Sequence, residues 1–284
     1  MTSRSPLVHF YLRHERLILG LAMIIMILVV WEGLARGWWA DLLSPVIGAG
    51  AEKLRVRPIF ISSPTAVASK AWELYVVTGE IWRHIGLSAL EILVGLGLAI
   101  LIGIPLGLWA GRRRYASYAL EPFMSALNAT PQVAFLPLIV LWIGTGFWCR
   151  ALIIFMLTLI PILINAHAAV RTIDPKLDRL ARSFSSSEWR FFTAIILPAS
   201  VPFLLAGLRL AIGRAMIGVV VGELYGSAIG IGIMINKAGA MFQTDVVFVG
   251  VFTIVAAGLG LTELLRLVER RVEQWRPAHA GQIT

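Results

Sequence analysis

The chain has 284 residues, of which 58% are hydrophobic and only 14% are charged, and its mean hydropathy is +0.82. These values exclude a disordered chain and an ordinary soluble domain, and they predict a bundle of membrane helices. The net charge of +9 does not indicate nucleic-acid binding here, because basic residues gather in the cytoplasmic loops of membrane proteins. One cysteine and five scattered histidines exclude an intrachain disulfide and predict no metal site.

Six apolar stretches are each long enough to cross a bilayer as a helix. They lie at residues 17–35, 85–111, 122–143, 148–170, 198–222 and 246–267. Between the first two, residues 64–78 have the pattern of an amphipathic helix lying on the membrane surface. The sequence therefore predicts an all-α fold, a polytopic membrane helix bundle with six transmembrane helices in a single domain over residues 17–284.

The distribution of basic residues predicts the orientation of these spans. Six spans place both termini on the same side, and lysine and arginine are more numerous in the segments that are inside if the N-terminus is cytoplasmic. We therefore expect a cytoplasmic tail (1–16), a cytoplasmic segment at 171–198 and a cytoplasmic C-terminus. Residues 36–84 and 223–245 would be periplasmic. The basic residues within 36–84 run against the rule, but long loops translocate largely regardless of charge.

Two ladders of small residues predict close approach of helix backbones in lipid. The first is Ala99, Gly103, Gly107 and Gly111, and the second is Gly218, Gly222 and Gly226. Such ladders serve either packing within one subunit or a seam between two subunits, and the sequence leaves both interpretations open.

The polar segment 171–198 is too long for a turn and too charged for lipid, so we expect two short helices outside the membrane. Asp174 followed by Pro175 is typical of a helix start, with Asp as N-cap and Pro at the first helical position. The first helix then carries an apolar face and, on another side of the helix, a basic face. The apolar face consists of Leu177, Leu180, Ala181 and Phe184, and the basic one of Lys176, Arg179 and Arg182.

The second helix of this segment is predicted to begin at Ser185, because Ser185 and Glu188 have the spacing of a capping box. Its apolar stripe would be Trp189, Phe192 and Ile195, and Pro198 would end it. A small helical knob that is apolar on one side and basic on the other suits a groove in a soluble partner. The alternative is an inert connector with solvated charges, which would not require aromatic side chains in register.

No motif for chemistry is present. The chain has no GxxxxGK[ST] sequence, so it does not bind ATP through a P-loop. No Ser/His/Asp set, HExxH sequence or pair of catalytic carboxylates stands out. We therefore expect a non-catalytic membrane subunit without a cofactor of its own.

The segment 171–198 resembles the cytoplasmic loop of bacterial ABC-transporter permease subunits, the binding-protein-dependent inner-membrane components. The family motif fits from Arg179-Leu180-Ala181 through Ser185 to Ile195, Leu197 and Pro198 with its spacing intact. Arg179 stands where the family has Glu, and Ser185 where it has Gly. Residues 78–111, 131–146, 207–224, 226–235 and 243–251 are also similar to family segments, and the nitrate, sulfonate and taurine branch is the most similar.

The resemblance implies an importer for a small anionic solute such as a sulfonate, taurine, nitrate or a related organic anion. It implies a dimer of permease subunits in the cell inner membrane, either two copies of this chain or this chain with a different permease subunit. It further implies a cytoplasmic ABC ATPase dimer that binds and hydrolyses ATP, and a periplasmic solute-binding protein. The loop would then be the coupling helix seated in the ATPase. The residues expected to couple to the ATPase are Leu177, Leu180, Ala181, Phe184, Ser185, Glu188, Trp189, Phe192, Leu197 and Pro198.

Three further residues are candidates for the solute pathway: Arg209, Arg214 and Glu223. An arginine within a span faces a cavity, a partner or the headgroups, so Arg214 could attract an anion; alternatively the arginines pair with Glu91 or Glu223. Glu223 is also expected to orient the glycine-rich segment that follows it. A secondary carrier and a non-transporting membrane scaffold subunit are the alternative classes. A carrier would need paired intramembrane acids and repeated broken helices, which the sequence does not display.

Overall fold

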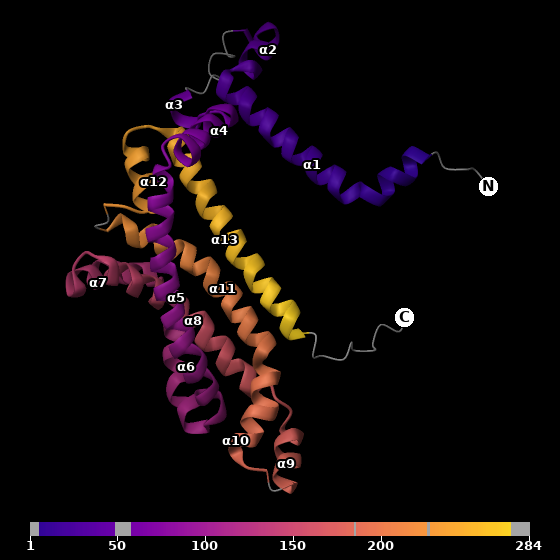
Figure 1. The fold of residues 1–284 in the computed structure, drawn as a ribbon, viewed down its shortest axis with the longest axis vertical. Helices are drawn as coiled ribbons and strands as arrows, with labels where there is room; N and C mark the ends of the chain where they lie inside the picture. Colours follow the sequence, from indigo (N-terminus) through magenta and orange to yellow (C-terminus); the bar gives the residue numbers. More distant parts are fainter. Residues whose placement is uncertain (1–5, 49–57, 185, 226–227, 274–284) are drawn as a thin grey trace. The chain divides into compact units, whose positions relative to one another are not determined.

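The computed structural model describes residues 6–48, 58–184, 186–225 and 228–273, and these residues form helices and no strand (Figure 1). Helices labelled η are π-helical, except η3, which is a 3-10 helix. The bounds are α1 Pro6–Arg36, α2 Trp38–Ile47, α3 Pro58–Ile61, α4 Pro64–Trp72, η2 Glu73–Val77, α5 Glu80–Arg112, α6 Arg114–Ala129, η3 Gln132–Phe135, α7 Leu136–Ile143, α8 Phe147–Arg171, α9 Pro175–Ser183, α10 Glu188–Phe191, η4 Phe192–Ile196, α11 Leu197–Leu224, α12 Ile231–Ala240 and α13 Thr244–Glu273.

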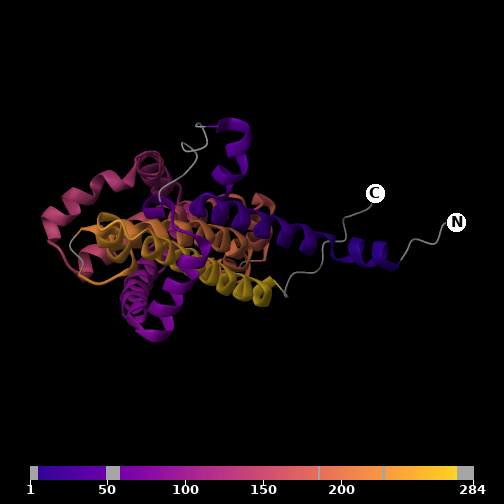
Figure 2. The ribbon, with the colours of Figure 1, turned by 90° about the horizontal axis from the view of Figure 1, so that it is seen from above.

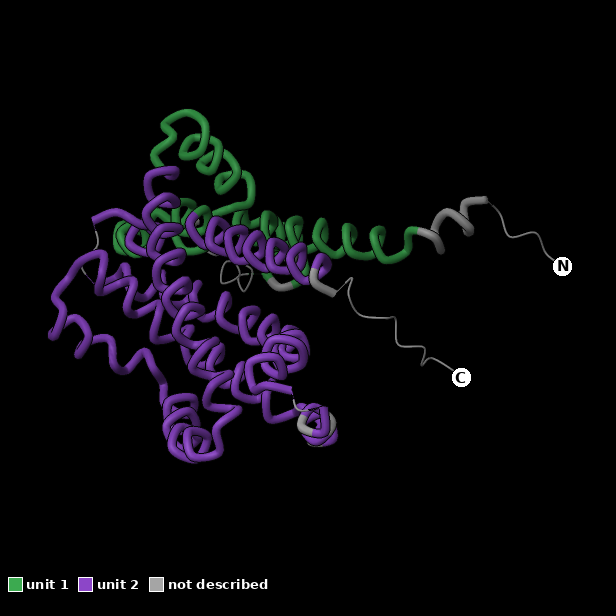
Figure 3. The backbone as a smooth tube through the Cα atoms, turned by 60° about the horizontal axis from the view of Figure 1, so that its bottom comes forward, with its two compact units in different colours: residues 1–80, 235–249 green, residues 81–234, 250–284 purple. Residues whose placement is uncertain are grey.

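The chain divides into two compact units, coloured separately in Figure 3. Unit 1 comprises residues 1–80 and 235–249. Within it the Glu32 carboxylate of α1 accepts hydrogen bonds from the backbone N–H and the hydroxyl of Thr65, at 3.1 and 2.8 Å. Ser63 caps α4 by accepting from the Ala66 N–H, so the helix predicted at 64–78 is present as α4 and η2.

Unit 2 comprises residues 81–234 and 250–284, and its core is the packing of α5 and α11 against α8. Of the candidate membrane spans, α8 is the most enclosed, because 61% of its most apolar stretch is buried. Figure 1 shows α11 running beside α8. α8 therefore forms the centre of unit 2, and the helices around it carry the side chains described below.

Glycines allow this close packing. A Cβ at Gly107 would lie 2.6 Å from the Ala166 Cβ and 2.7 Å from the Leu163 carbonyl oxygen, and one at Gly111 would lie 2.7 Å from the His167 oxygen. Gly218 of α11 faces Ile154 of α8 in the same way. The interpretation of the ladders as packing within one subunit is thus confirmed for these positions, whereas Gly226 lies outside the described residues.

The third predicted span is broken. α6 and the η3–α7 segment meet at an angle of 91°, and the change of direction is visible in Figure 2. The bend falls at Thr130-Pro131, where Thr130 has the extended conformation that a following proline imposes. Five helices are long and apolar enough to cross a membrane, or six if this bent pair is one span, so the all-α bundle is confirmed while the prediction of one continuous third helix is wrong.

Candidate functional site

The segment 171–198 folds into two helices as predicted, and we call it the coupling loop after the role that the resemblance implies. Asp174 begins α9: its Oδ1 accepts from the Lys176 N–H at 2.8 Å, and its backbone oxygen accepts from the Leu177 N–H. Pro175 occupies the first helical position, where its missing N–H costs nothing. The local sequence therefore determines where the loop enters its first helix.

The second helix begins and ends differently from the prediction. Ser187 caps α10 by accepting from the Arg190 N–H at 3.3 Å, whereas Ser185, the predicted cap, lies outside the described residues. Pro198 does not end the helix, because α10, η4 and α11 follow one another without a break from Glu188 to Leu224. Pro198 instead lies in the first turn of α11, directly after the π-helical turn, where proline is tolerated. The loop is therefore joined to α11 by continuous helix.

Two aromatic side chains of the coupling loop extend into solvent. Phe184 is 78% exposed and Trp189 is 74% exposed, and the Trp189 ring stacks on Phe192 at a centroid distance of 6.1 Å. On the inner side, Ala181 and Phe192 pack against a buried cluster that includes Phe191 and Ile196. Leu177 is 39% and Leu197 40% exposed, Glu188 and Pro198 are exposed, and the side chain of Leu180 lies outside the described residues.

Arg112, the last residue of α5, holds the two loop helices together. Its Nη2 lies 3.0 Å from Asp178 Oδ1 on α9 and 3.0 Å from Glu188 Oε2 on α10. Its guanidinium also lies over the Phe191 ring, 4.8 Å from the centroid. No local pattern connects positions so far apart in the chain, so this contact could not have been found from the sequence.

The two arginines within α11 have partners other than those considered from the sequence. Arg209 forms an ion pair with Glu269 of α13 at 2.7 Å. Arg214 donates to the amide oxygen of Asn128 on α6 at 3.2 Å, and within the described part of the chain it has no carboxylate partner. Its positive charge therefore lies within a span with only a neutral amide beside it.

Glu223 is fully buried at the end of α11 and binds the glycine-rich segment, which confirms that predicted contact. Its carboxylate accepts from the Gly232 N–H and from the Ser88 hydroxyl of α5, each at 2.5 Å. The Ser88 oxygen in turn accepts from the Ile231 N–H at 3.0 Å, and the Gly230 N–H donates to Nδ1 of His84 at 2.9 Å. Glycine is required at 230, where φ is +139°. Both α5 and α11 therefore bind the segment 230–232.

A buried ion pair joins α5 to α8. Nε of Arg150 lies 2.5 Å from Oε1 of Glu91, and the side chains are 7% and 0% exposed. The sequence suggested Glu91 as a possible partner for Arg209 or Arg214, whereas its partner in the structure is Arg150. The pair brings together two charges that would be costly to bury separately, although Oε2 of Glu91 has no hydrogen-bond partner among the described residues.

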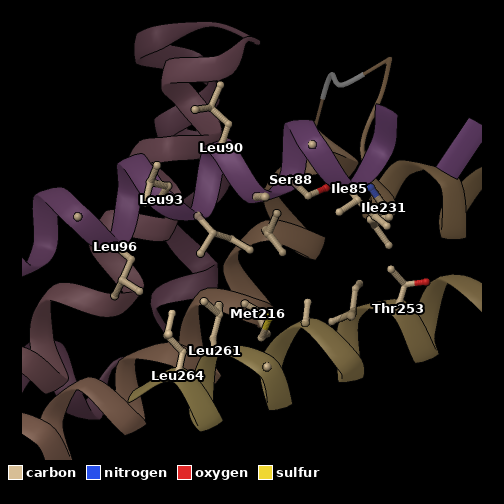
Figure 4. Close-up of a pocket in the computed structure, with 18 of the residues that line it drawn as sticks. Ile85, Ser88, Leu90, Leu93, Leu96, Met216, Ile231, Thr253, Leu261 and Leu264 are labelled. Carbon is tan, nitrogen blue, oxygen red and sulfur yellow. Dashed lines mark hydrogen bonds between the residues drawn. The ribbon is translucent and has the colours of Figure 1, made fainter. Parts of the chain in front are cut away.

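An apolar groove of about 730 Å³ lies in unit 2 between α5, α11 and α13 (Figure 4). Its walls are aliphatic, with Leu93, Met216 and Leu261 among them, and the only hydroxyl groups on them are those of Ser88 and Thr253. No charged side chain lines it. This groove therefore lacks the groups that an anion needs. The described residues contain no group of His, Cys, Asp and Glu arranged to hold a metal ion.

Comparison with known proteins places this geometry in context. The model of the family described as "Binding-protein-dependent transport system inner membrane component" matches residues 103–274. The putative aliphatic sulfonates transport permease protein of Bacillus subtilis is 33% identical over 258 residues, which covers 86% of this chain and 90% of that protein. The taurine transport system permease protein of Escherichia coli is 30% identical over 78% of this chain and 82% of its own length.

The riboflavin transport system permease protein of Chloroflexus aurantiacus is 33% identical over 97% of both chains. Among solved structures, a chain of the MetNI methionine ABC transporter in inward-facing conformations matches with a TM-score of 0.55 and 16% sequence identity. The match covers 70% of this chain and 99% of that one. At this identity the structural likeness supports the fold alone.

Proposed function

The chain belongs to the family of binding-protein-dependent transport system inner membrane components, and from that premise we propose how its parts move a solute. It is a multi-pass inner-membrane permease subunit of an ABC importer. We infer that two copies form the pathway, with a periplasmic binding protein on one side and an ATPase dimer on the other. The ATPase subunits bind and hydrolyse ATP, and this chain contributes no catalytic residue or cofactor. The termini and the coupling loop face the cytoplasm.

The observation that carries this proposal is the exposure of Phe184 and Trp189 on a loop that is otherwise anchored by buried side chains. Large aromatic side chains on a fixed surface are typical anchors of protein interfaces. In the proposed mechanism they sit in a cleft of the ATPase. When the ATPase dimer closes, the loop moves with it, and the continuous helix from Glu188 to Leu224 carries the displacement into the membrane as a change between two states.

We propose that the solute is a small organic anion of the sulfonate class. Support comes from the relatives that transport aliphatic sulfonates and taurine and from Arg214, whose charge has no carboxylate partner among the described residues. Arg214 lies about 24 Å along the helix from Pro198 at 1.5 Å per residue, which is deep within the span. A positive charge there is stabilised by a passing anion.

Riboflavin is a second candidate solute, favoured by the relative whose similarity covers 97% of the chain. Purified permease, ATPase and binding protein in proteoliposomes distinguish the two. ATP-dependent uptake of taurine or an alkanesulfonate supports the proposal. Uptake of riboflavin alone would show that the solute is the flavin and not the anion.

The role of Arg214 is tested in the same vesicles. Arg214→Ala should lower uptake of the anion while the complex still assembles, and Arg214→Lys should retain part of the uptake because it keeps the charge. Normal uptake by Arg214→Ala would remove this residue from the pathway.

A further inference from the structure

The coupling loop is connected to the membrane helices by two routes. One is covalent, at both ends of the loop: α8 leads into α9, and α10 continues through η4 into α11. The other is the side chain of Arg112, which brings the end of α5 into contact with Asp178 on α9 and Glu188 on α10. α5 has no covalent route to the loop, because α6, α7 and α8 intervene in the chain. Any displacement of the loop therefore reaches α5 only through packing and through this arginine.

Both helices also meet at their other ends. α11 ends at Glu223, which binds the Gly232 N–H, and α5 carries Ser88 and His84, which bind Ile231 and Gly230. Ser88 and Arg112 are separated by about 36 Å of helix at 1.5 Å per residue. α5 and α11 thus both extend, in opposite chain directions, between the coupling loop and the segment 230–232. If α5 or α11 moved alone, the segment 230–232 would be distorted. If both helices moved together, the segment would be displaced as a unit.

We propose that Arg112 is a positioning residue that transmits the movement of the coupling loop to α5, so that α5 and α11 move together. The inference rests on the proposed function of the loop and goes beyond it by assigning a role to a residue outside the loop. The geometry suits arginine, because one planar guanidinium reaches two carboxylates and covers the Phe191 ring. A lysine is a point charge and cannot make all three contacts. The Arg112 and Asp178 side chains are 25% and 28% exposed, so their ion pair is partly shielded from water, whereas Glu188 is 65% exposed.

The number of solute molecules imported per ATP hydrolysed, measured with the full complex in proteoliposomes, tests this role. Arg112→Gln should leave the ATPase bound and hydrolysing ATP but lower that ratio about tenfold, within the usual range for coupling between sites. Arg112→Lys should recover part of the ratio. The matched control is Arg114→Gln, because Arg114 contacts Tyr118 on its own helix and no loop residue, so its ratio should match that of the unchanged protein.

Exchanging the charges of Arg112 and Glu188 distinguishes a role in transmitting movement from a loss of folding. Arg112→Glu should lower the ratio strongly, and adding Glu188→Arg should restore part of it. The proposal is overturned if the import ratio of Arg112→Gln stays within twofold of that of the control. It is also overturned if Arg114→Gln lowers the ratio equally, or if Arg112→Gln no longer binds the ATPase. A failure of the proposed function would be seen separately, because the unchanged complex itself would then show no ATP-driven uptake.

Discussion

Trp189 is the single residue on which the docking of the ATPase is expected to depend most. It is large, exposed and held against Phe192, so it reaches a partner surface with little further loss of side-chain entropy. Burying such a side chain stabilises a complex by about 1.5–3 kcal/mol.

We therefore predict that Trp189→Ala weakens the affinity of the permease for the ATPase by about ten- to a hundredfold, measured by titration of the ATPase onto permease in nanodiscs. Trp142→Ala is the matched control, since Trp142 of α7 has the same exposed fraction of 74% but lies within a predicted span. Equal affinity for both variants would contradict a docking role for Trp189.

The Glu91–Arg150 ion pair should matter for stability rather than for coupling. Removing one partner of a buried pair leaves an unpaired charge and costs about 3–5 kcal/mol. Arg150→Met should therefore lower the melting temperature of the purified protein in detergent.

The double variant Arg150→Met with Glu91→Gln should recover much of the lost stability, because no isolated charge remains. If the double variant melts no higher than Arg150→Met, the loss does not arise from an unpaired Glu91 carboxylate.

At the residue scale, the sequence predicted contacts that are local and missed those that are not. Asp174-Pro175 identified the start of α9, because a cap acts on backbone groups two residues away. In the run of three serines, capping-box spacing selected Ser185, whereas Ser187 caps the helix. The partners of Arg112 and Arg150 lie 66, 76 and 59 positions away in the chain, and no pattern in a single sequence marks such pairs.

Among the elements, α5 and α8 approach so closely that a side chain at the glycines between them would meet backbone atoms. A Cβ at Gly95 would lie 2.6 Å from the Ala151 carbonyl oxygen and 2.7 Å from the Ile154 Cβ. Backbone atoms cannot move aside cheaply, so the helices would have to separate.

Gly95→Ala is therefore expected to reduce the yield and melting temperature of the folded protein. Gly97→Ala, two residues further along α5, is the matched control, because a Cβ there meets nothing within 4 Å. A Gly97→Ala variant as unstable as Gly95→Ala would mean that helix separation is not the cause.

Element boundaries followed the hydropathy of the sequence except at prolines. Pro131 breaks the third span at an angle of 91°, whereas Pro198 interrupts nothing, since it falls in the first turn of a helix. The same residue type thus ends one helix and is accommodated in another, depending on whether the preceding turn needs its N–H. Periodicity alone does not distinguish these cases.

For the whole molecule, composition and hydropathy were sufficient to predict an all-α membrane bundle, and the spacing of the loop motif was sufficient to predict the family. The antiparallel arrangement of α5 and α11 was not predictable, because it depends on Arg112 at one end and on Ser88, His84 and Glu223 at the other. These are contacts between helices distant in the chain. The function of the molecule, on our account, is to carry a displacement from the loop to the segment they hold.

The account depends most on the loop lying in the cytoplasm against the ATPase. The direct measurement is thiol cross-linking of Phe184→Cys to the ATPase in membrane vesicles, in a Cys149→Ala background that removes the one native cysteine. We predict a cross-linked product whose yield changes when ATP is added, and none from Met241→Cys, an exposed position in the segment that we expect to be periplasmic. The account would be contradicted if Phe184→Cys gave no cross-linked product and its cysteine were instead labelled by an impermeant thiol reagent from the outside of intact cells.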